Sequence, residues 1–127
     1  MKYVGSAHWF LPWLILVVGM YSIIRFTRGY INERAFTPTD QRLVTVFSGL
    51  MDLQGLLGLI FLLGTGFAGI GFPVDRILHG LAMFAAVVVP HFSRLWKSAD
   101  DQTRHVNNFF VILSSFLLML FGLAFVH

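Results

Sequence analysis

Residues 43–72 read LVTVFSGLMDLQGLLGLIFLLGTGFAGIGF, a run in which Asp52 is the only charged residue. An α-helix rises about 1.5 Å per residue, so about 20 apolar residues cross the hydrocarbon core of a bilayer. Three more runs of this kind lie at residues 8–24, 77–96 and 105–126. The sequence therefore predicts an all-α integral membrane four-helix bundle, formed by one domain over residues 1–127. Its helices are expected at about residues 8–25, 42–68, 75–97 and 103–126.

The composition agrees with a membrane protein and excludes several kinds of chemistry. Of the 127 residues, 57% are hydrophobic and 12% are charged, whereas soluble domains carry about 25% charged residues. The absence of cysteine excludes disulfides, thiolate catalysis and iron–sulfur ligation by this chain. A polar side chain inside an apolar run is costly, so each one needs a structural or functional reason.

The basic residues are unevenly placed along the chain. Lys and Arg total nine, and seven of them lie in or beside residues 25–42 and 94–104, leaving only Lys2 and Arg76 elsewhere. Because cytoplasmic loops collect Lys and Arg, both termini are expected on the outer side of the membrane. The placement of the charges that make up the net +3 therefore indicates the topology of a multi-pass membrane protein, and not nucleic-acid binding.

Several helix ends and one kink can be predicted from local sequence. Asp40 is expected to cap the second helix, and Ser98 with Asp101 resembles a capping box before the fourth. Pro90 removes a backbone donor and is expected to kink the third helix next to His91. Glycines are expected to end the second helix at positions 64, 66, 69 and 71.

Histidines on different helices suggest haem as a ligand. Two imidazoles that face each other across an apolar slot can hold haem iron from both sides. His8 and His79 would form such a pair at the outer side, and His91 and His105 would form one at the inner side. His79 and His91 are 12 residues apart, which places them about 120° apart around one helix. This spacing predicts one haem at most, because two haems stacked in one bundle need ligands on one face.

The alternative for each histidine is an interfacial role. Histidines near helix ends hydrogen-bond lipid headgroups or backbone, and this role is expected for His105 and His127. Ser114 and Ser115 are expected to bond to the backbone of their own helix.

Asp52 and Gln54 lie near the middle of the second helix, where polar groups cost most. Asp52 is a candidate for proton transfer, for pairing with a histidine or for a quinone site. Gln54 points to nearly the opposite face, so it cannot share a site with Asp52 directly, and it is expected to bond to a neighbouring helix. Together with His91, these residues make up a candidate proton or quinone site.

The chain resembles small four-helix bacterial membrane proteins described as cytochrome-b-like. The resemblance covers nearly the whole chain and rests on these motifs: His8-x4-Trp13, Asp40, Asp52-Leu53-Gln54-x3-Gly58, Asp75-Arg76-x2-His79-x3-Met83 and His91-x2-Arg94. Pro12 and Asp52 depart from the family pattern. The resemblance implies a component of membrane electron transfer. It also implies larger protein partners, such as the subunits of a respiratory or photosynthetic complex like alternative complex III.

Three functions remain open from the sequence. The first is an electron-transfer subunit with one haem b, in which His8 and His79 ligate the iron and Met83 and Trp13 line the pocket. The second is a structural subunit that shapes a quinone site in a larger complex without binding haem. The third is a proton or small-solute carrier that uses Asp52 and His91 as relay groups. None of the three gives the chain an independent enzymatic activity.

Overall fold

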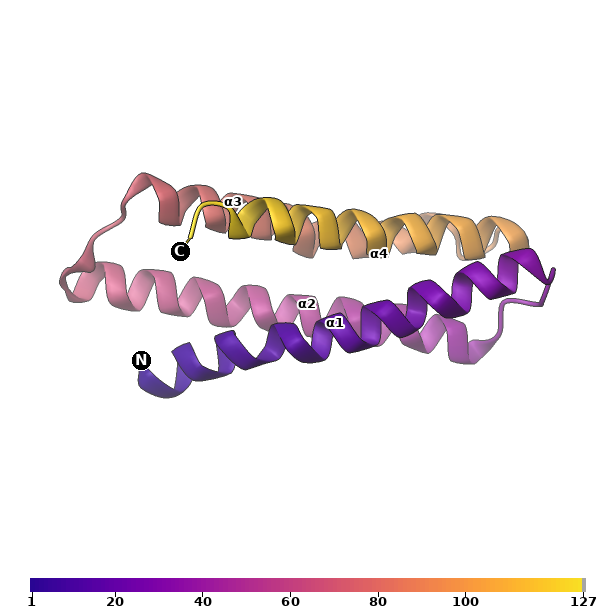
Figure 1. Cartoon of the computed structure of the whole chain (residues 1–127), viewed down its shortest axis with the longest axis horizontal. Helices are drawn as coiled ribbons and strands as arrows, with labels where there is room; N and C mark the ends of the chain where they lie inside the picture. The colour runs from indigo at the N-terminus through magenta and orange to yellow at the C-terminus, as the bar shows by residue number, and fades with distance from the viewer. Residues whose placement is uncertain (127) are drawn as a thin grey trace.

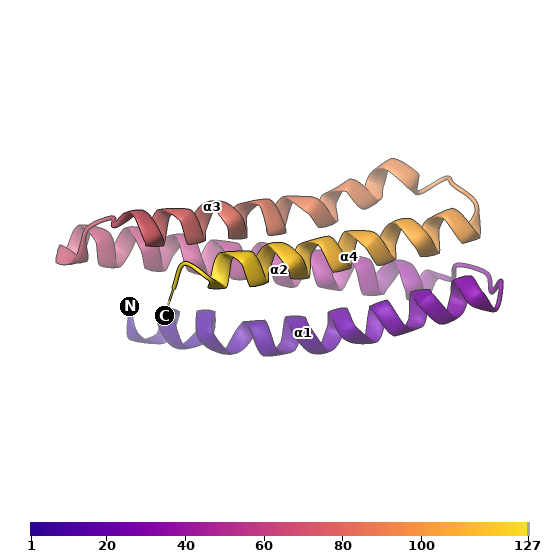
Figure 2. The same ribbon diagram turned by 45° about the horizontal axis from the view of Figure 1, so that its top comes forward.

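The computed structural model describes residues 1–126 and consists of four long antiparallel helices (Figures 1 and 2). They are α1 (Lys2–Ile31), α2 (Pro38–Thr65), α3 (Val74–Val88) and α4 (Asp101–Leu123). A π-helical segment, η1 (Gly66–Ile70), extends α2, and a 3-10 segment, η2 (Val89–Trp96), extends α3. With these extensions, all four helices are long and apolar enough to cross a membrane. The predicted fold is confirmed, and the chain is a small multi-pass membrane protein.

Each helix packs against two neighbours around the bundle. α1 contacts α2 and α4, and α3 contacts the same two helices, so α1 and α3 lie on a diagonal. Both termini lie at one end of the bundle (Figure 1). We call this the outer end, and the end that holds residues 32–37 and 97–100 the inner end. Which end faces the cytoplasm remains a prediction from the basic residues.

The densest part of the core lies toward the inner end. The largest fully buried apolar side chains are Phe26, Phe47, Ile15, Met51, Ile112 and Val44. Nearer the outer end, the facing side chains are only partly buried, as at His8, Gln54, His79 and Met83. The bundle is therefore tightly packed in one half and looser in the half that carries His8 and His79.

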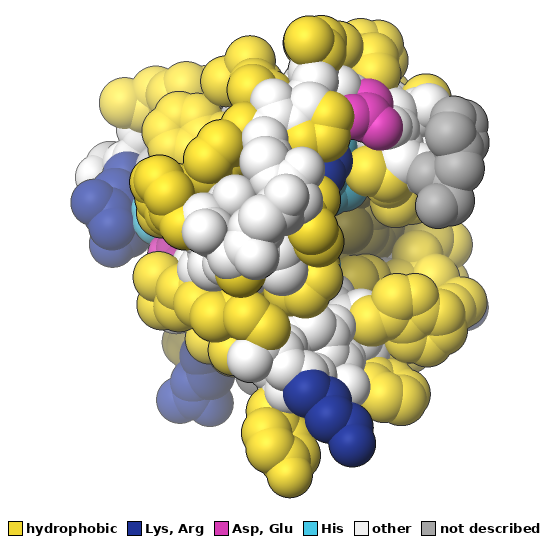
Figure 3. Space-filling model, turned by 90° about the vertical axis from the view of Figure 1, so that its left-hand side faces the viewer, with side chains coloured by type: hydrophobic (Ala, Val, Ile, Leu, Met, Phe, Trp, Pro, Cys, Tyr) yellow, Lys and Arg dark blue, Asp and Glu magenta, His cyan; other side chains and the backbone are white. Residues whose placement is uncertain are grey.

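The outside of the bundle is strongly apolar. Large side chains face outward along every helix, including Trp9, Val17, Leu56, Phe84 and Leu120. Hydrophobic atoms cover most of the surface seen from the outer end (Figure 3). This surface fits lipid as the surrounding medium, because monomeric soluble proteins rarely expose continuous apolar patches of such extent.

The predicted caps of α2 and α4 were wrong by two or three residues. Thr37, not Asp40, caps α2, and Asp40 closes the capping box by accepting a 2.8 Å hydrogen bond from the Thr37 backbone. Pro38 explains the shift, because its fixed φ suits the first helical position. Asp100, not Ser98, caps α4 by accepting a 2.8 Å bond from the Thr103 backbone. Hydrogen bonds from Thr103 lower the pKa of the Asp100 carboxyl.

The expected breaks occur where glycine and proline lie. Gly69 and Gly71 have φ values of 126° and 77°, a backbone region that favours glycine, and they end the second span. At Pro90 the third helix tightens to a 3-10 helix from Val89 onward. α1 is longer than predicted at both ends, since it begins at Lys2 and ends at Ile31. Its last turns pack closely on α4, where a Cβ on Gly29 would meet the His105 ring.

Candidate functional site

Polar side chains from three helices meet in the looser, outer half of the bundle. We call this group the outer polar site. Contacts through Phe61 or with one another join His8, Gln54 and Arg76, and His79 lies one turn after Arg76 on α3. His8 belongs to α1, Gln54 and Phe61 to α2, and Arg76 and His79 to α3. Figure 3 shows a hollow between the helices at this end, with a histidine and a basic side chain at its edge. His8 and His79, which the sequence paired at the outer side, therefore lie in the same half of the bundle, on α1 and α3.

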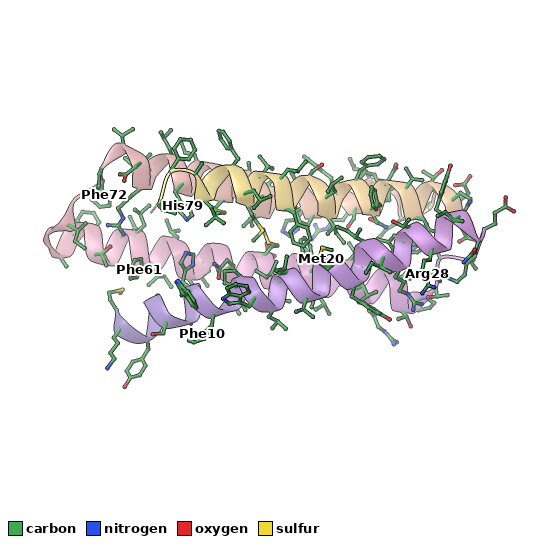
Figure 4. The ribbon with its side chains drawn as sticks, viewed as in Figure 1. Phe10, Met20, Arg28, Phe61, Phe72 and His79 are labelled. Carbon is green, nitrogen blue, oxygen red and sulfur yellow. The ribbon has the colours of Figure 1, made fainter. Side chains whose placement is uncertain are left out.

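His79 is held in a defined orientation. Its Nδ1 lies 2.9 Å from the backbone oxygen of Gly122 on α4. A carbonyl only accepts, so Nδ1 carries the proton and Nε2 keeps a free lone pair. Figure 4 shows His79 pointing from α3 toward the α1–α2 side of the bundle. A neutral imidazole fixed through Nδ1 in this way is the usual state of a metal-binding histidine.

His8 faces this region from the opposite diagonal helix. Its ring lies over Gly58, where an added Cβ would come within 2.8 Å of the imidazole Cε1. The ring also stacks on Phe61, with 6.5 Å between centroids, and Gln54 donates a 2.8 Å bond to the His8 backbone oxygen. The His8 Nδ1 atom is buried and has no hydrogen-bond partner within residues 1–126.

These features fit a haem held by two imidazoles. The donors are two histidines on diagonal helices, one of them fixed in the metal-binding tautomer. Gly58 keeps backbone, and not a side chain, beside the His8 ring. The buried Nδ1 atom of His8 shows that this ring still lacks a polar partner.

The two other pocket residues expected from the sequence lie in different places. Met83 is partly buried between α3 and α4, where its Cε would lie 3.0 Å from a Cβ built on Gly122. It is therefore one turn along α3 from His79. Trp13 is 58% exposed on the outside of α1, with its ring 6.2 Å from that of Trp9. Trp13 faces the lipid, because five helical positions turn it well away from His8.

Arg76 belongs to the outer polar site, although the sequence reasoning assigned it only to topology. Its side chain is partly buried, and its guanidinium lies 5.8 Å from the centre of the Phe61 ring. One Nη donates a 2.7 Å bond to Thr65, and the other is buried without a partner within residues 1–126. The sequence signal that could have identified Arg76 was its position one turn before His79, at the start of a mainly apolar helix.

Asp52 and His91 form a second polar cluster on the outside of the bundle. The His91 Nε2 lies 2.8 Å from Asp52 Oδ1, and the side chains are 38% and 47% exposed. The 3-10 turns after Pro90 carry His91, which meets Asp52 near the middle of α2. Gln54 points elsewhere, toward His8, as its position two residues from Asp52 predicted. The sequence therefore found both members of this pair, and the tertiary structure joins them.

The second histidine pair proposed from the sequence does not form. His105 is fully buried, and its Nε2 donates to the Arg34 backbone oxygen at 2.9 Å. Its ring packs between Phe26 and Phe36, so His105 makes the backbone bond expected of it from a fully buried position. The chain folds this way because the first connection returns over the start of α4. His127 lies outside the described residues.

Two lateral grooves lie nearer the inner end. A groove of about 290 Å³ runs between α1 and α4, beside Phe26, Tyr30 and Phe109. A second groove of about 420 Å³ lies between η2 and α4, beside Phe92, Trp96 and Ser114. Neither groove includes His8 or His79. Ser115, expected to bond within its own helix, instead donates to the Ala86 backbone of α3 at 3.0 Å.

Within residues 1–126, no three His, Asp or Glu side chains gather as they would around a free metal ion. No protein-family model, curated protein or solved structure matches this chain.

Proposed function

We propose that this small multi-pass membrane protein binds one haem b at the outer polar site and serves membrane electron transfer. His8 and His79 would be the axial ligands, and Met83 would lie near the haem. When bound there, haem b would supply reversible one-electron transfer. The protein would work in the bacterial inner membrane with larger electron-transfer subunits, as the resemblance implies.

The observation that supports this proposal is that His8 and His79 lie in the same half of the bundle on diagonal helices, with His79 held in one orientation. The bond from His79 Nδ1 to the Gly122 carbonyl leaves Nε2 free for a metal. Gln54 holds the backbone of α1 beside His8 through its bond to the His8 carbonyl. The apolar surroundings from Phe61 and Met83 would keep water from the ligand.

The chain purified in mild detergent and supplied with haem b tests the proposal. We expect a sharp low-spin b-type band in the reduced-minus-oxidised spectrum of the wild-type chain. The band should be lost in His79→Ala and in His8→Ala, because each removes one axial ligand. His91→Ala is the matched control and should keep the band, since His91 bonds to Asp52.

Folded wild-type protein that gives no such band would overturn the haem proposal. It would leave the second function named from the sequence, a structural subunit that shapes a quinone site. That function predicts loss of a larger complex from native membranes when the chain is deleted. The two readouts therefore separate a haem protein from a cofactor-free subunit.

The Asp52–His91 pair favours a second candidate function, proton or small-solute transfer with a quinone site nearby. Two bonded titratable side chains on the lipid-facing side of a membrane helix are costly unless they handle protons or a ligand. We expect Asp52→Asn to slow proton uptake into vesicles about a hundredfold, the lower end of the range usual for loss of one acid–base group. Asp75→Asn, at the outer start of α3, should leave uptake unchanged. Equal rates in both variants would remove this candidate.

A further inference from the structure

Arg76 carries a positive charge into the outer polar site, and no carboxylate of residues 1–126 forms an ion pair with it. The ion pairs within residues 1–126 use Asp40 and Asp52, and neither involves Arg76. Asp75, the adjacent carboxylate in the chain, accepts a bond from the Arg76 backbone and is exposed to the outside. It therefore does not neutralise the guanidinium.

The Arg76 side chain points inward although it lies near the membrane surface. Arg76 is the third residue of α3, so its long side chain is close enough to the outer surface to reach water. Instead it lies over Phe61 and donates to Thr65, with one Nη buried and unpartnered in the described chain. Burying a guanidinium with an unpaired N–H group costs free energy unless an anion accepts a hydrogen bond from it.

The Phe61 ring lies between Arg76 and His8. Phe61 lies 5.8 Å from the Arg76 guanidinium and 6.5 Å from the His8 ring. Arg76 also precedes His79 by three positions, which places both on one face of α3. A ligand held by His8 and His79 would therefore extend toward Arg76 if it carried an anionic group on its outer side.

We propose that Arg76 and Thr65 form an anion subsite that binds the carboxylates of the haem. The inference rests on the proposed function and adds an orientation: the carboxylate edge of the haem faces the outer end. Arginine suits this role, because its planar fork of donors matches a carboxylate and is always charged. Thr65 would orient the guanidinium through the 2.7 Å bond it already makes.

The test compares haem b with its dimethyl ester, in which both carboxylates are blocked. Each is titrated into the full wild-type chain and into Arg76→Gln, and binding is followed by visible absorption. We expect the wild-type chain to prefer haem b by about tenfold or more, the range for one charge-assisted hydrogen bond. Arg76→Gln should lose this preference and bind both forms equally. Arg76→Lys should keep part of it, because a lysine retains the charge but not the planar fork.

The outcomes separate this inference from the haem proposal itself. Equal binding of the two porphyrins by the wild-type chain would overturn the anion subsite and leave haem binding in place. An unchanged preference in Arg76→Gln would also overturn it, since the carboxylates would then be held elsewhere. Failure of either porphyrin to bind folded wild-type protein would overturn both proposals. Arg94→Gln, at the inner end, is the charge-matched control and should behave like the wild type.

Discussion

The Asp40→Ala variant is expected to lose about 2–4 kcal/mol of unfolding free energy, because it removes the buried carboxylate that pairs with Arg25 and Arg34. Asp40 is fully buried, and its carboxylate bonds to Arg25, Arg34 and Thr37. These contacts join the end of α1, the first connection and the start of α2. Without Asp40, both guanidiniums lose their buried counterion and the capping box opens. The arginines are 28% and 34% exposed, so partial hydration limits the loss.

Unfolding in mixed detergent micelles, followed by circular dichroism, measures this effect. Asp40→Asn should fall between wild type and Asp40→Ala, since an amide keeps an acceptor but loses the charge. Glu33→Gln is the matched control: it removes one negative charge from the same connection at an exposed position. If Asp40→Ala were no less stable than Glu33→Gln, the contacts of Asp40 with Arg25 and Arg34 would not stabilise the fold.

Gly29→Ala is expected to weaken the contact between α1 and α4 by about 1–3 kcal/mol, the usual cost of overpacking. A Cβ at this position would lie 2.4 Å from the His105 Cε1. The His105 ring cannot easily retreat, because it is fully buried, bonds to Arg34 and packs between two phenylalanines. The helix would therefore have to move away from α4 at its inner end.

Gly49→Ala provides the matched control for this substitution. A Cβ at Gly49 meets nothing within 4 Å, so the change should be neutral or slightly stabilising. Combining Gly29→Ala with His105→Ala should recover part of the lost stability, because the smaller side chain makes room for the new methyl group. Equal stability of the two single glycine variants would show that α1 and α4 are not closely packed at Gly29.

The membrane-spanning helices could be predicted because a bilayer imposes a length and a polarity on each of them. Runs such as residues 43–72 leave no alternative that buries as much apolar surface and satisfies the backbone. The helix ends were less accurate: Thr37 was missed as a cap, and α1 extends to Ile31. The Thr37 cap has a local signal that was overlooked, since Thr37 precedes Pro38 and Asp40 follows three positions later. The end of α1 instead involves a tertiary contact, that of Gly29 with His105, which leaves no local pattern.

The residues of the candidate site were likewise predicted only in part from the sequence. The sequence named His8 and His79, because a polar group inside an apolar run stands out. It placed Trp13 in the pocket, whereas this side chain is exposed on the outside of α1, and it did not reveal that His105 is fully buried. Arg76 was overlooked because a basic residue near a membrane surface normally turns toward water. Its contacts with Thr65 and Phe61, which the tertiary structure shows, make Arg76 a candidate to bind an anionic group of a ligand.

The sequence by itself determined the number of helices, their membrane character and the set of polar residues inside them, because composition and hydropathy are local properties. The tertiary structure decided which of these residues meet. It places Asp52 beside His91 and puts His8 and His79 on diagonal helices. It also orients the His79 ring through a hydrogen bond to the Gly122 backbone oxygen. Such pairings follow from how each helix is rotated against its neighbours, and small residues such as Gly58 and Gly122 set that rotation by allowing close approach.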